Sequence, residues 1–352
     1  MNASGLYIYG IINSDSGKIL ANFSTTDGDK VYCIPYQEIS AVVCRSKVIN
    51  YSYMPKDALV RLLLKHQLLI EEIMNLGSPI IPMKLGTFVS DEKEANNFLS
   101  KGYALSKEIL KKINDKIEID VVVTWNDLTS VLKEISEDNV IKDIKQSMLA
   151  EQKGITVENQ IRIGTLIKNE LDQIRGIISS NIFTSLKDCC DDIKTHAPMD
   201  DKMIANFASL IKKEKRKEFE EKVDKLNSTF SGKLNFKCVG PLPPYSFYTL
   251  EMKKLLQKDL EWALNLLELK NSTITKDEIK KAYRRLSFSS HPDKNPKAGN
   301  SEKEFDQLNK AYKVLYEFCH SQEQIESGKS KFCYLNNFED SAIVVRVRNQ
   351  HD

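Results

Sequence analysis

The residues best placed to do chemistry are His291, Pro292 and Asp293, which follow one another in the chain. An imidazole and a carboxylate flank a proline, whose ring fixes φ and disfavours a helical conformation for the residue before it. The tripeptide is therefore expected at the exposed end of a helix, where both polar groups can contact a partner. By itself, it is equally consistent with a proline-terminated turn that carries two incidental polar side chains.

Two stretches with helical periodicity enclose the tripeptide, at 276–290 and at 302–319. A Ser/Thr-x-x-Glu capping box opens each of them. Two amphipathic helices joined by a short loop pack as an antiparallel hairpin. The apolar faces contain Ile279, Ala282, Tyr283 and Leu286 in the first helix and Phe305, Leu308, Ala311, Tyr312 and Leu315 in the second.

The opposite face of the first predicted helix is basic, with Lys280, Lys281, Arg284 and Arg285. A charged helix face is usually a solvated surface without a partner. Its position next to His291 favours the other interpretation, a docking surface.

The whole arrangement resembles the J-domain family over about residues 259–320. The similar runs are 264–269, 279–286, 291–296 and 305–315. The resemblance implies an all-α helical hairpin and a co-chaperone that binds Hsp70 and stimulates its ATP hydrolysis. It implies that the tripeptide and the basic helix face bind Hsp70. Two features depart from the family pattern: Glu268 stands where a Gly is usual, and the chain after Cys319 lacks the usual Arg-containing fourth helix.

The composition narrows the possible classes of protein and the kinds of partner. The 352 residues carry a net charge of +2, which does not favour nucleic acid as a partner. No apolar run approaches the length of a transmembrane helix, and no signal peptide is apparent, so a cytoplasmic protein without a membrane partner is expected. The seven cysteines show no CxxC spacing. We interpret them as reduced, mostly buried thiols, and we expect neither a metal site nor a cofactor.

Residues 1–128 are predicted to form an α+β domain of ferredoxin-like type. The alternation of buried strands and amphipathic helices supports this. Strands are expected at 6–12, 31–34, 39–44 and 118–125, helices at 55–77 and 91–114, and an extended apolar segment at 78–89.

Residues 129–252 are predicted to form a second, helix-rich α+β domain. Its elements are a long charged helix at 139–178, a strand or buried segment at 203–210, a charge-laced helix at 212–226 and a strand at 234–239. Beyond the hairpin, residues 323–352 form a tail with a strand-like pattern at 341–348. If this strand returns to pair with the sheet of the second domain, the hairpin is an insertion rather than an appendage.

The second domain ends in the octapeptide Gly240 to Phe247, which contains three prolines. Because proline removes a backbone donor and fixes φ, the octapeptide is predicted to be neither helix nor central strand. Taken alone, it reads as a rigid connector that packs its aromatic side chains on its own domain.

The octapeptide resembles the closing signature of the gas vesicle protein F/L family, carried by Gly240, Pro241, Pro243, Pro244, Tyr245 and Phe247. Three other segments agree in order, so that the resemblance covers about residues 5–250. These are Leu6 to Gly10, then His66 with Pro79 to Thr87, and then Glu118 to Trp125. Two residues depart from the pattern, Leu242 where Trp is common and Leu85 where an aromatic residue is common.

The family resemblance implies a two-domain protein that takes part in gas vesicle assembly, binds the small hydrophobic shell protein and other gas vesicle proteins, and associates with gas vesicles. Together with the J-domain, it suggests an assembly factor that recruits Hsp70. The alternative is a general Hsp70 co-chaperone whose N-terminal region binds clients unrelated to vesicles. The chain contains no Walker loop, GxSxG or HExxH motif, so no enzymatic activity is expected.

Overall fold

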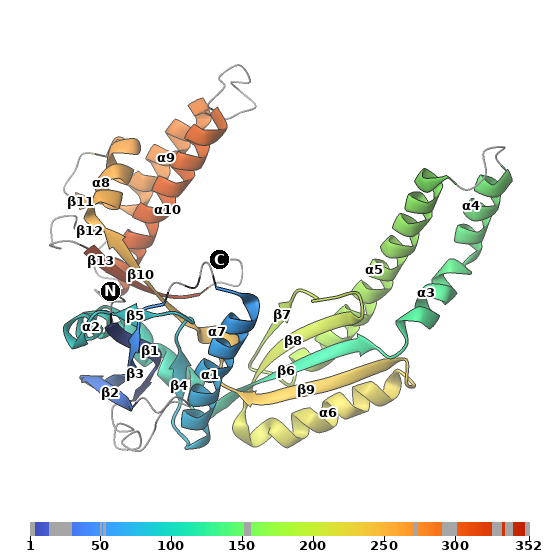
Figure 1. The fold of residues 1–352 in the computed structure, drawn as a ribbon, viewed down its shortest axis with the longest axis horizontal. Coiled ribbons are helices and arrows are strands. Elements are labelled where there is room, and N and C mark those ends of the chain that lie inside the picture. Colours follow the sequence, from blue (N-terminus) through green and yellow to red (C-terminus); the bar gives the residue numbers. More distant parts are fainter. Residues whose placement is uncertain are drawn as a thin grey trace. The chain divides into compact units, whose positions relative to one another are not determined.

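The fold is described from a computed structural model, which covers residues 4–13, 30–49, 51, 54–150, 156–269, 273–290, 301–325, 333–334 and 341–348. The chain divides into two compact units, Met1–Asn114 with Tyr248–Asp352 and Asp115–Phe247. Each unit combines helices with a β-sheet of its own (Figure 1), so the predicted α+β class is confirmed. Among the described residues, no helix is both long and apolar enough to cross a membrane.

The first unit is built on an antiparallel sheet in the order β2-β3-β1-β4, with β5 also paired to β1. Strand β1 is buried along almost its whole length, because helices cover both faces of the sheet. Alternate β1 side chains contact α1 on one face and pack with α2 on the other. The elements are β1 (Ser4–Asn13), β2 (Val31–Tyr36), β3 (Ile39–Lys47), α1 (Lys56–Asn75), β4 (Ile80–Pro82), β5 (Phe88–Val89) and α2 (Glu92–Ile113).

The second unit has the element order β-α-β-β-α-β and the sheet order β7-β8-β6-β9, all antiparallel. This is the ferredoxin-like arrangement, which the sequence pattern assigned to residues 1–128 instead. Strand β6 belongs here because it pairs with β8 along one edge and with β9 along the other. The strands are β6 (Lys116–Trp125), β7 (Asp192–His196), β8 (Met203–Lys212) and β9 (Leu234–Leu242).

Helices α3 (Leu128–Ser136), α4 (Asn139–Ala150) and α5 (Val157–Lys187) follow β6. The single long helix predicted at 139–178 is therefore divided, and α5 alone has 31 residues. Thr156 caps α5 by accepting a hydrogen bond from the Asn159 N–H, which explains why a new helix begins there. The remaining helical segments of the second unit are η3 (Lys213–Lys215), α6 (Arg216–Thr229) and the single turn α7 (Tyr245–Tyr248).

The predicted helical hairpin is present and forms the all-α part of the first unit. Helices α9 (Lys276–Ser290) and α10 (Ser301–Ile325) pack on α8 (Gln257–Leu266). The capping box at the start of α9 is complete: Thr275 N–H donates to Glu278 Oε2, and Glu278 N–H donates to Thr275 Oγ1. The core of the hairpin contains Ile279, Ala282, Leu308, Ala311 and Leu315 as predicted, with Tyr283, Leu286 and Tyr312 at its edge.

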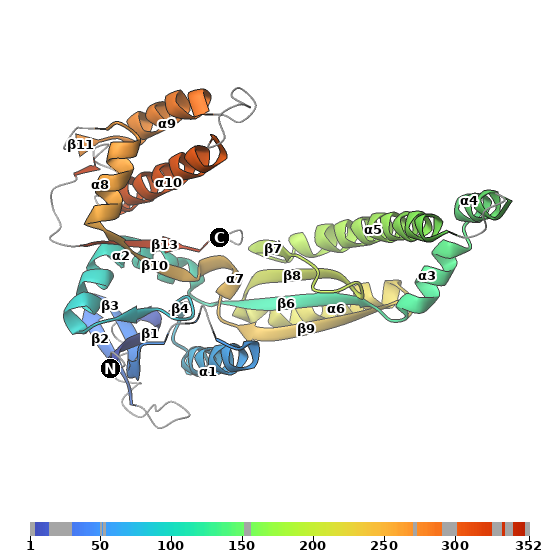
Figure 2. The ribbon, with the colours of Figure 1, turned by 45° about the horizontal axis from the view of Figure 1, so that its top comes forward.

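A two-stranded ribbon joins the helical hairpin to the rest of the first unit. Strand β10 (Leu250–Leu256) precedes the helices, and β13 (Ser341–Val347) follows them and pairs antiparallel with β10 (Figures 1 and 2). The hairpin is therefore an insertion. The returning strand pairs with β10 rather than with the sheet of the second domain, because β10 and β13 bury their side chains in the cores of the first unit.

The ribbon buries both of its faces. On one face Leu250, Ile343 and Val345 belong to the core that contains β1 and α2. On the other face Leu255 and Val344 belong to the core of the helical hairpin. Since side chains alternate along a strand, the same ribbon contributes to two hydrophobic cores and holds the helical hairpin against the rest of the first unit.

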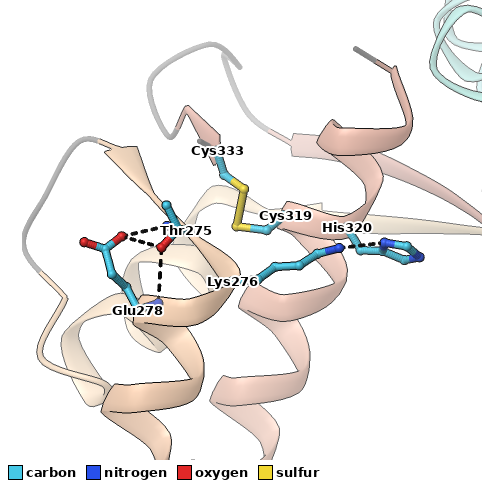
Figure 3. Close-up of a disulfide and its surroundings, with 6 residues drawn as sticks. All are labelled: Thr275, Lys276, Glu278, Cys319, His320 and Cys333. Carbon is cyan, nitrogen blue, oxygen red and sulfur yellow. Dashed lines mark hydrogen bonds between the residues drawn. A yellow bond between two sulfur atoms is a disulfide. The ribbon is translucent and has the colours of Figure 1, made fainter. Parts of the chain in front are cut away.

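A disulfide further ties the helical hairpin to the returning chain. Cys319 near the end of α10 bonds to Cys333 in β12 (Cys333–Tyr334), with Cα atoms 5.3 Å apart (Figure 3). Strand β12 pairs with β11 (Thr273–Ile274), just before α9, which brings the two sulfurs together. The interpretation of all seven cysteines as reduced thiols is thus wrong for this pair, which is 14 residues apart in sequence. Of the remaining five, only Cys44 is buried.

Candidate functional site

The tripeptide His291, Pro292 and Asp293 lies outside the described residues. The helices on either side place it between the end of α9 at Ser290 and the start of α10 at Ser301. The assignment of these three residues to Hsp70 binding therefore stays a prediction. The basic face of α9 and the segments of the family signature are described, and they can be analysed directly.

The four residues of the basic face of α9 do not have equal access to a partner. Lys280 is half-buried, and its ammonium lies 5.5 Å from the centre of the Tyr316 ring. Arg285 is exposed and pairs with Glu268 at 2.6 Å. Lys281 and Arg284 are exposed, and within the described part of the chain neither takes part in an ion pair. These two cations are therefore the most available for docking.

The double variant Lys281→Glu/Arg284→Glu is expected to slow association with Hsp70 about tenfold or more at low salt, because like charges then oppose the encounter. Association rates measured by surface plasmon resonance at several salt concentrations test this. The matched control is Lys303→Glu/Lys313→Glu, which changes the net charge equally at two exposed positions of α10. If both double variants slow association equally, the α9 face has no specific role.

Glu268 occupies a position that favours glycine. It lies directly after Leu267, the C-cap of α8, and has a φ of 56°, in the left-handed region. The Glu268 N–H donates to Asn265 O at 3.2 Å and the Leu269 N–H donates to Leu264 O at 2.9 Å, which is a Schellman motif. The departure from the J-domain pattern thus changes the residue but keeps the backbone geometry.

Replacing Glu268 by Gly is expected to raise the free energy of unfolding by about 1 kcal/mol, because glycine adopts the left-handed conformation without a steric penalty. The lost ion pair with Arg285 is exposed on both sides and contributes little. Urea denaturation measures the change. Glu268→Ala is the control, since it removes the same ion pair but keeps a Cβ. A stability of Glu268→Gly below that of Glu268→Ala would contradict this account.

A chain of charged side chains links the helical hairpin to the ribbon. Glu251 of β10 is buried and accepts hydrogen bonds from Lys84 and from Arg346, the residue opposite it on β13, with an Arg346 Nη2 to Glu251 Oε2 distance of 2.9 Å. Arg346 Nη1 also lies 3.0 Å from Oε1 of Glu317 on α10, and Lys253 pairs with the same carboxylate at 2.9 Å. Burial opposes ionisation of Glu251, but Lys84 and Arg346 hold its pKa below the usual value.

In the first unit, His66 contacts two segments of the family resemblance, Leu6 to Gly10 and Pro79 to Thr87. Tyr7 OH lies 2.7 Å from His66 Nδ1, and His66 Nε2 lies 3.0 Å from Met83 O. A carbonyl can only accept, so Nε2 carries the proton and Tyr7 donates to Nδ1. The Tyr9 ring stacks on the imidazole. His66 is therefore a buried helix residue whose two ring nitrogens both take part in hydrogen bonds.

Burial lowers the pKa of His66 to about 4, although its hydrogen bond to Met83 opposes the shift. In the unfolded chain a histidine titrates near 6.5. Acid therefore protonates the unfolded state first, and the free energy of unfolding is expected to fall by about 3 kcal/mol as the pH drops from 6.5 to 4. Urea denaturation across this range should show a steeper pH dependence for the wild type than for His66→Gln. Equal slopes would exclude His66 as the cause.

In the second unit, the last two family segments meet at Glu118. Ser246 donates to this buried carboxylate twice, from its backbone N–H to Oε2 at 2.9 Å and from Oγ to Oε1 at 2.7 Å. Lys194 Nζ donates to Ser246 O at 2.8 Å, and His196 Nε2 lies 3.0 Å from Ser246 Oγ. Burial and the neighbouring Asp120 raise the pKa of Glu118.

The structure explains two residue types of the signature. Gly240 has a φ of 145°, and a Cβ on it would lie 2.9 Å from the carbonyl oxygen of Glu118. Phe247 is buried and packs under the Lys194 ammonium, 5.2 Å from the ring centre. Gly240 and Pro241 continue the edge strand β9, and Tyr245 begins the turn α7, so the octapeptide is partly helical, contrary to expectation. The helical turn is allowed because Pro243 and Pro244 precede it.

Comparison with known proteins identifies the two parts of the chain. Residues 5–249 match the model of the family described as gas vesicle synthesis protein GvpL/GvpF. The chain belongs to the GvpL/GvpF family. Residues 264–318 match the DnaJ domain model, so the helical hairpin is a J-domain. Both resemblances seen in the sequence are thereby confirmed.

The relatives support the same division. Gas vesicle protein F of Nostoc sp. strain PCC 7120 is 26% identical over 247 residues, which cover 70% of this chain and 98% of the relative. The crystal structure of GvpF from Anabaena sp. PCC7120 aligns with a TM-score of 0.58 over 70% of this chain and 98% of that chain. Chaperone protein DnaJ of Prosthecochloris aestuarii is 58% identical over 41 residues, only 10% of its length, so the J-domain alone is shared.

Sequence patterns alone could not identify some residues of these sites. Lys194 and His196 carry no motif and lie about fifty positions from Ser246, their partner. The network of Glu251, Arg346 and Glu317 likewise joins residues of ordinary charged type. Opposite charges on facing strands would have been a usable signal only once the pairing of β10 with β13 was known.

Proposed function

We propose that the chain is a gas vesicle assembly factor that binds the small hydrophobic shell protein and recruits Hsp70 through its J-domain. The observation that carries the proposal is the union of a GvpL/GvpF protein and a J-domain in one chain, with the J-domain mounted on the first unit by the ribbon of β10 and β13. A subunit that assembles through apolar surface is prone to aggregate before it is placed. A factor that holds the subunit next to an ATP-driven chaperone would limit this.

A stripe of apolar side chains on α1 supports the shell-binding part of the proposal. Val60, Leu63, Leu64 and Leu68 follow helical spacing, and each is at least 40% exposed. Contiguous exposed apolar surface is typical of interaction sites in soluble proteins. An apolar client fits such a surface better than a charged one does.

We propose further that the chain has no catalytic activity of its own and acts in the cytoplasm in association with gas vesicles. In this scheme ATP is hydrolysed by Hsp70, and the J-domain supplies the docking residues Lys281 and Arg284 together with the predicted tripeptide at 291–293.

The structure suggests how to separate the two activities. Truncation after Met252 would remove β13, which contributes Ile343 and Val345 to the core of the first domain. Excision of 257–340 keeps both strands, because Leu256 and Ser341 lie opposite each other and an Asn-Gly turn can join them. Leu255 and Val344 become Thr in this variant, since they otherwise expose the face left by the J-domain.

Co-purification with the shell protein and Hsp70 tests the proposal. The full chain is expected to capture both proteins, whereas the excision variant captures the shell protein only. Leu64→Gln/Leu68→Gln is expected to capture Hsp70 only. If the excision variant still unfolds in a cooperative thermal transition but loses the shell protein, the assignment of shell binding to the rest of the chain is wrong. If the full chain captures Hsp70 but not the shell protein, the general co-chaperone function is favoured.

A further inference from the structure

A pocket of about 530 Å³ opens in the second unit, between helices α3 and α5 and the turn that leads into β9. Its position is set by the backbone: the Asn126 N–H donates to Lys233 O, and Asn126 Nδ2 donates to Gly232 O, each at 3.0 Å. These bonds hold the end of β6 against the turn before β9. The pocket is therefore built by regular elements and pinned loops of one unit.

The inner wall of the pocket is apolar. Val131 and Ile135 of α3 line it together with Ile174 and Ile178 of α5 and with Trp125 at the end of β6. Trp125 is 6% exposed, and its buried indole N–H has no hydrogen-bond partner among the residues that the structure describes. Buried polar groups are usually paired. The wall of the pocket therefore combines apolar surface with the unpaired indole N–H of Trp125, a hydrogen-bond donor with no acceptor among the described residues.

The rim of the pocket is acidic. Asp127, Glu134, Asp138 and Glu170 line it, against one lysine, Lys233. Asp127 and Asp138 each accept a hydrogen bond from a backbone N–H of the following helix. Glu134 and Glu170 are exposed and, among the described residues, have no ion-pair partner. An apolar cavity with two such carboxylates at its edge is complementary to an apolar side chain flanked by cations.

We propose that this pocket docks an amphipathic helix of a partner protein, with apolar side chains in the cavity and Lys or Arg against Glu134 and Glu170. A helix is favoured over an extended peptide because the apolar lining comes mainly from two helices, α3 and α5, between which another helix can pack. This docking site is separate from α1 and from the J-domain, so it adds a partner contact to the proposed function and does not depend on it.

Trp125 provides a direct readout. The chain has two tryptophans, and Trp262→Phe leaves Trp125 as the only one. The probes are two synthetic helical peptides of about 18 residues, one built from Leu and Lys and the other from Leu and Glu in the same helical pattern. The full-length Trp262→Phe chain is expected to bind the Leu/Lys peptide at least about tenfold more tightly than the Leu/Glu peptide, with a shift in Trp125 emission.

Charge reversal makes the test specific. Glu134→Lys/Glu170→Lys is expected to weaken binding of the Leu/Lys peptide at least about tenfold and to improve binding of the Leu/Glu peptide. Glu218→Lys/Glu221→Lys, at two exposed positions of α6, changes the net charge equally and should leave both affinities unchanged. Ile174→Asn should weaken both peptides. Equal binding of the two peptides by the unreversed chain, or equal effects of the two charge reversals, would overturn the proposal.

Discussion

The His291→Gln variant is expected to lose all stimulation of ATP hydrolysis by Hsp70 while it keeps the stability of the wild-type chain. The J-domain resemblance assigns His291 to partner contact, where a glutamine cannot satisfy the same polar groups in the same geometry. The J-domain core is formed by residues such as Ile279, Leu308 and Leu315, which the change leaves intact. The sequence predicts His291 at an exposed helix end, and a substitution at an exposed position usually alters the free energy of unfolding by less than about 0.5 kcal/mol.

Single-turnover ATP hydrolysis by Hsp70, measured beside a thermal melt of each variant, tests this expectation. His320→Gln is the matched control, because His320 is an exposed histidine of the same domain, on α10, and should not affect stimulation. Lost stimulation with a lowered melting temperature would make the tripeptide a structural element. A wild-type chain that stimulates no Hsp70 from the same cell would mean that the J-domain keeps its fold without this activity.

The Glu251→Met variant is expected to lose about 3 kcal/mol of unfolding free energy. Glu251 is 7% exposed and accepts hydrogen bonds from both Lys84 and Arg346. Its removal takes one of two carboxylates away from the half-buried Arg346 guanidinium, which still pairs with Glu317. Breaking a buried ion pair costs roughly 3–5 kcal/mol, because the remaining charge is no longer compensated.

The double variant Glu251→Met/Arg346→Met separates the ion pair from packing. Replacing both partners by apolar side chains of similar size is often nearly neutral, so most of the lost stability should return. Glu317 keeps Lys253 as its partner in this variant. Urea denaturation of the single and double variants completes the cycle. If the double variant loses as much unfolding free energy as Glu251→Met and Arg346→Met lose together, the network acts through side-chain volume and not through charge.

Local patterns of the sequence predicted most helices and strands. Strand β1, helices α1 and α2, and the helix pair α9 and α10 each carry a clear apolar period, and capping residues such as Thr275 mark the helix starts. The basic residues of α9 were found for the same reason, since spacing along a helix decides which side chains share a face. The family motifs then located His66 and Gly240 at positions that the fold explains.

Pairing over long distances could not be read from such patterns. Strand β6 has the same apolar character whether it closes the first sheet or centres the second, so the ferredoxin-like order was assigned to the wrong part of the chain. Likewise, the partner of β13 is β10, more than eighty residues earlier, and the Cys319–Cys333 bond depends on the pairing of β11 with β12. Local sequence patterns do not indicate which distant strands or cysteines pair with each other.

The ribbon also determines how tension would pass between Hsp70 and the rest of the chain. Both strands enter the J-domain at the same end, at Leu256 and Ser341. At the other end, Thr249 and Arg348 continue the two strands and are joined by a hydrogen bond from the Arg348 N–H to Thr249 O, and Val345 of β13 packs against α2. A pulling force on the J-domain would act on all the backbone hydrogen bonds between β10 and β13 at once, in shear. The ribbon would therefore resist the force as one cooperative element.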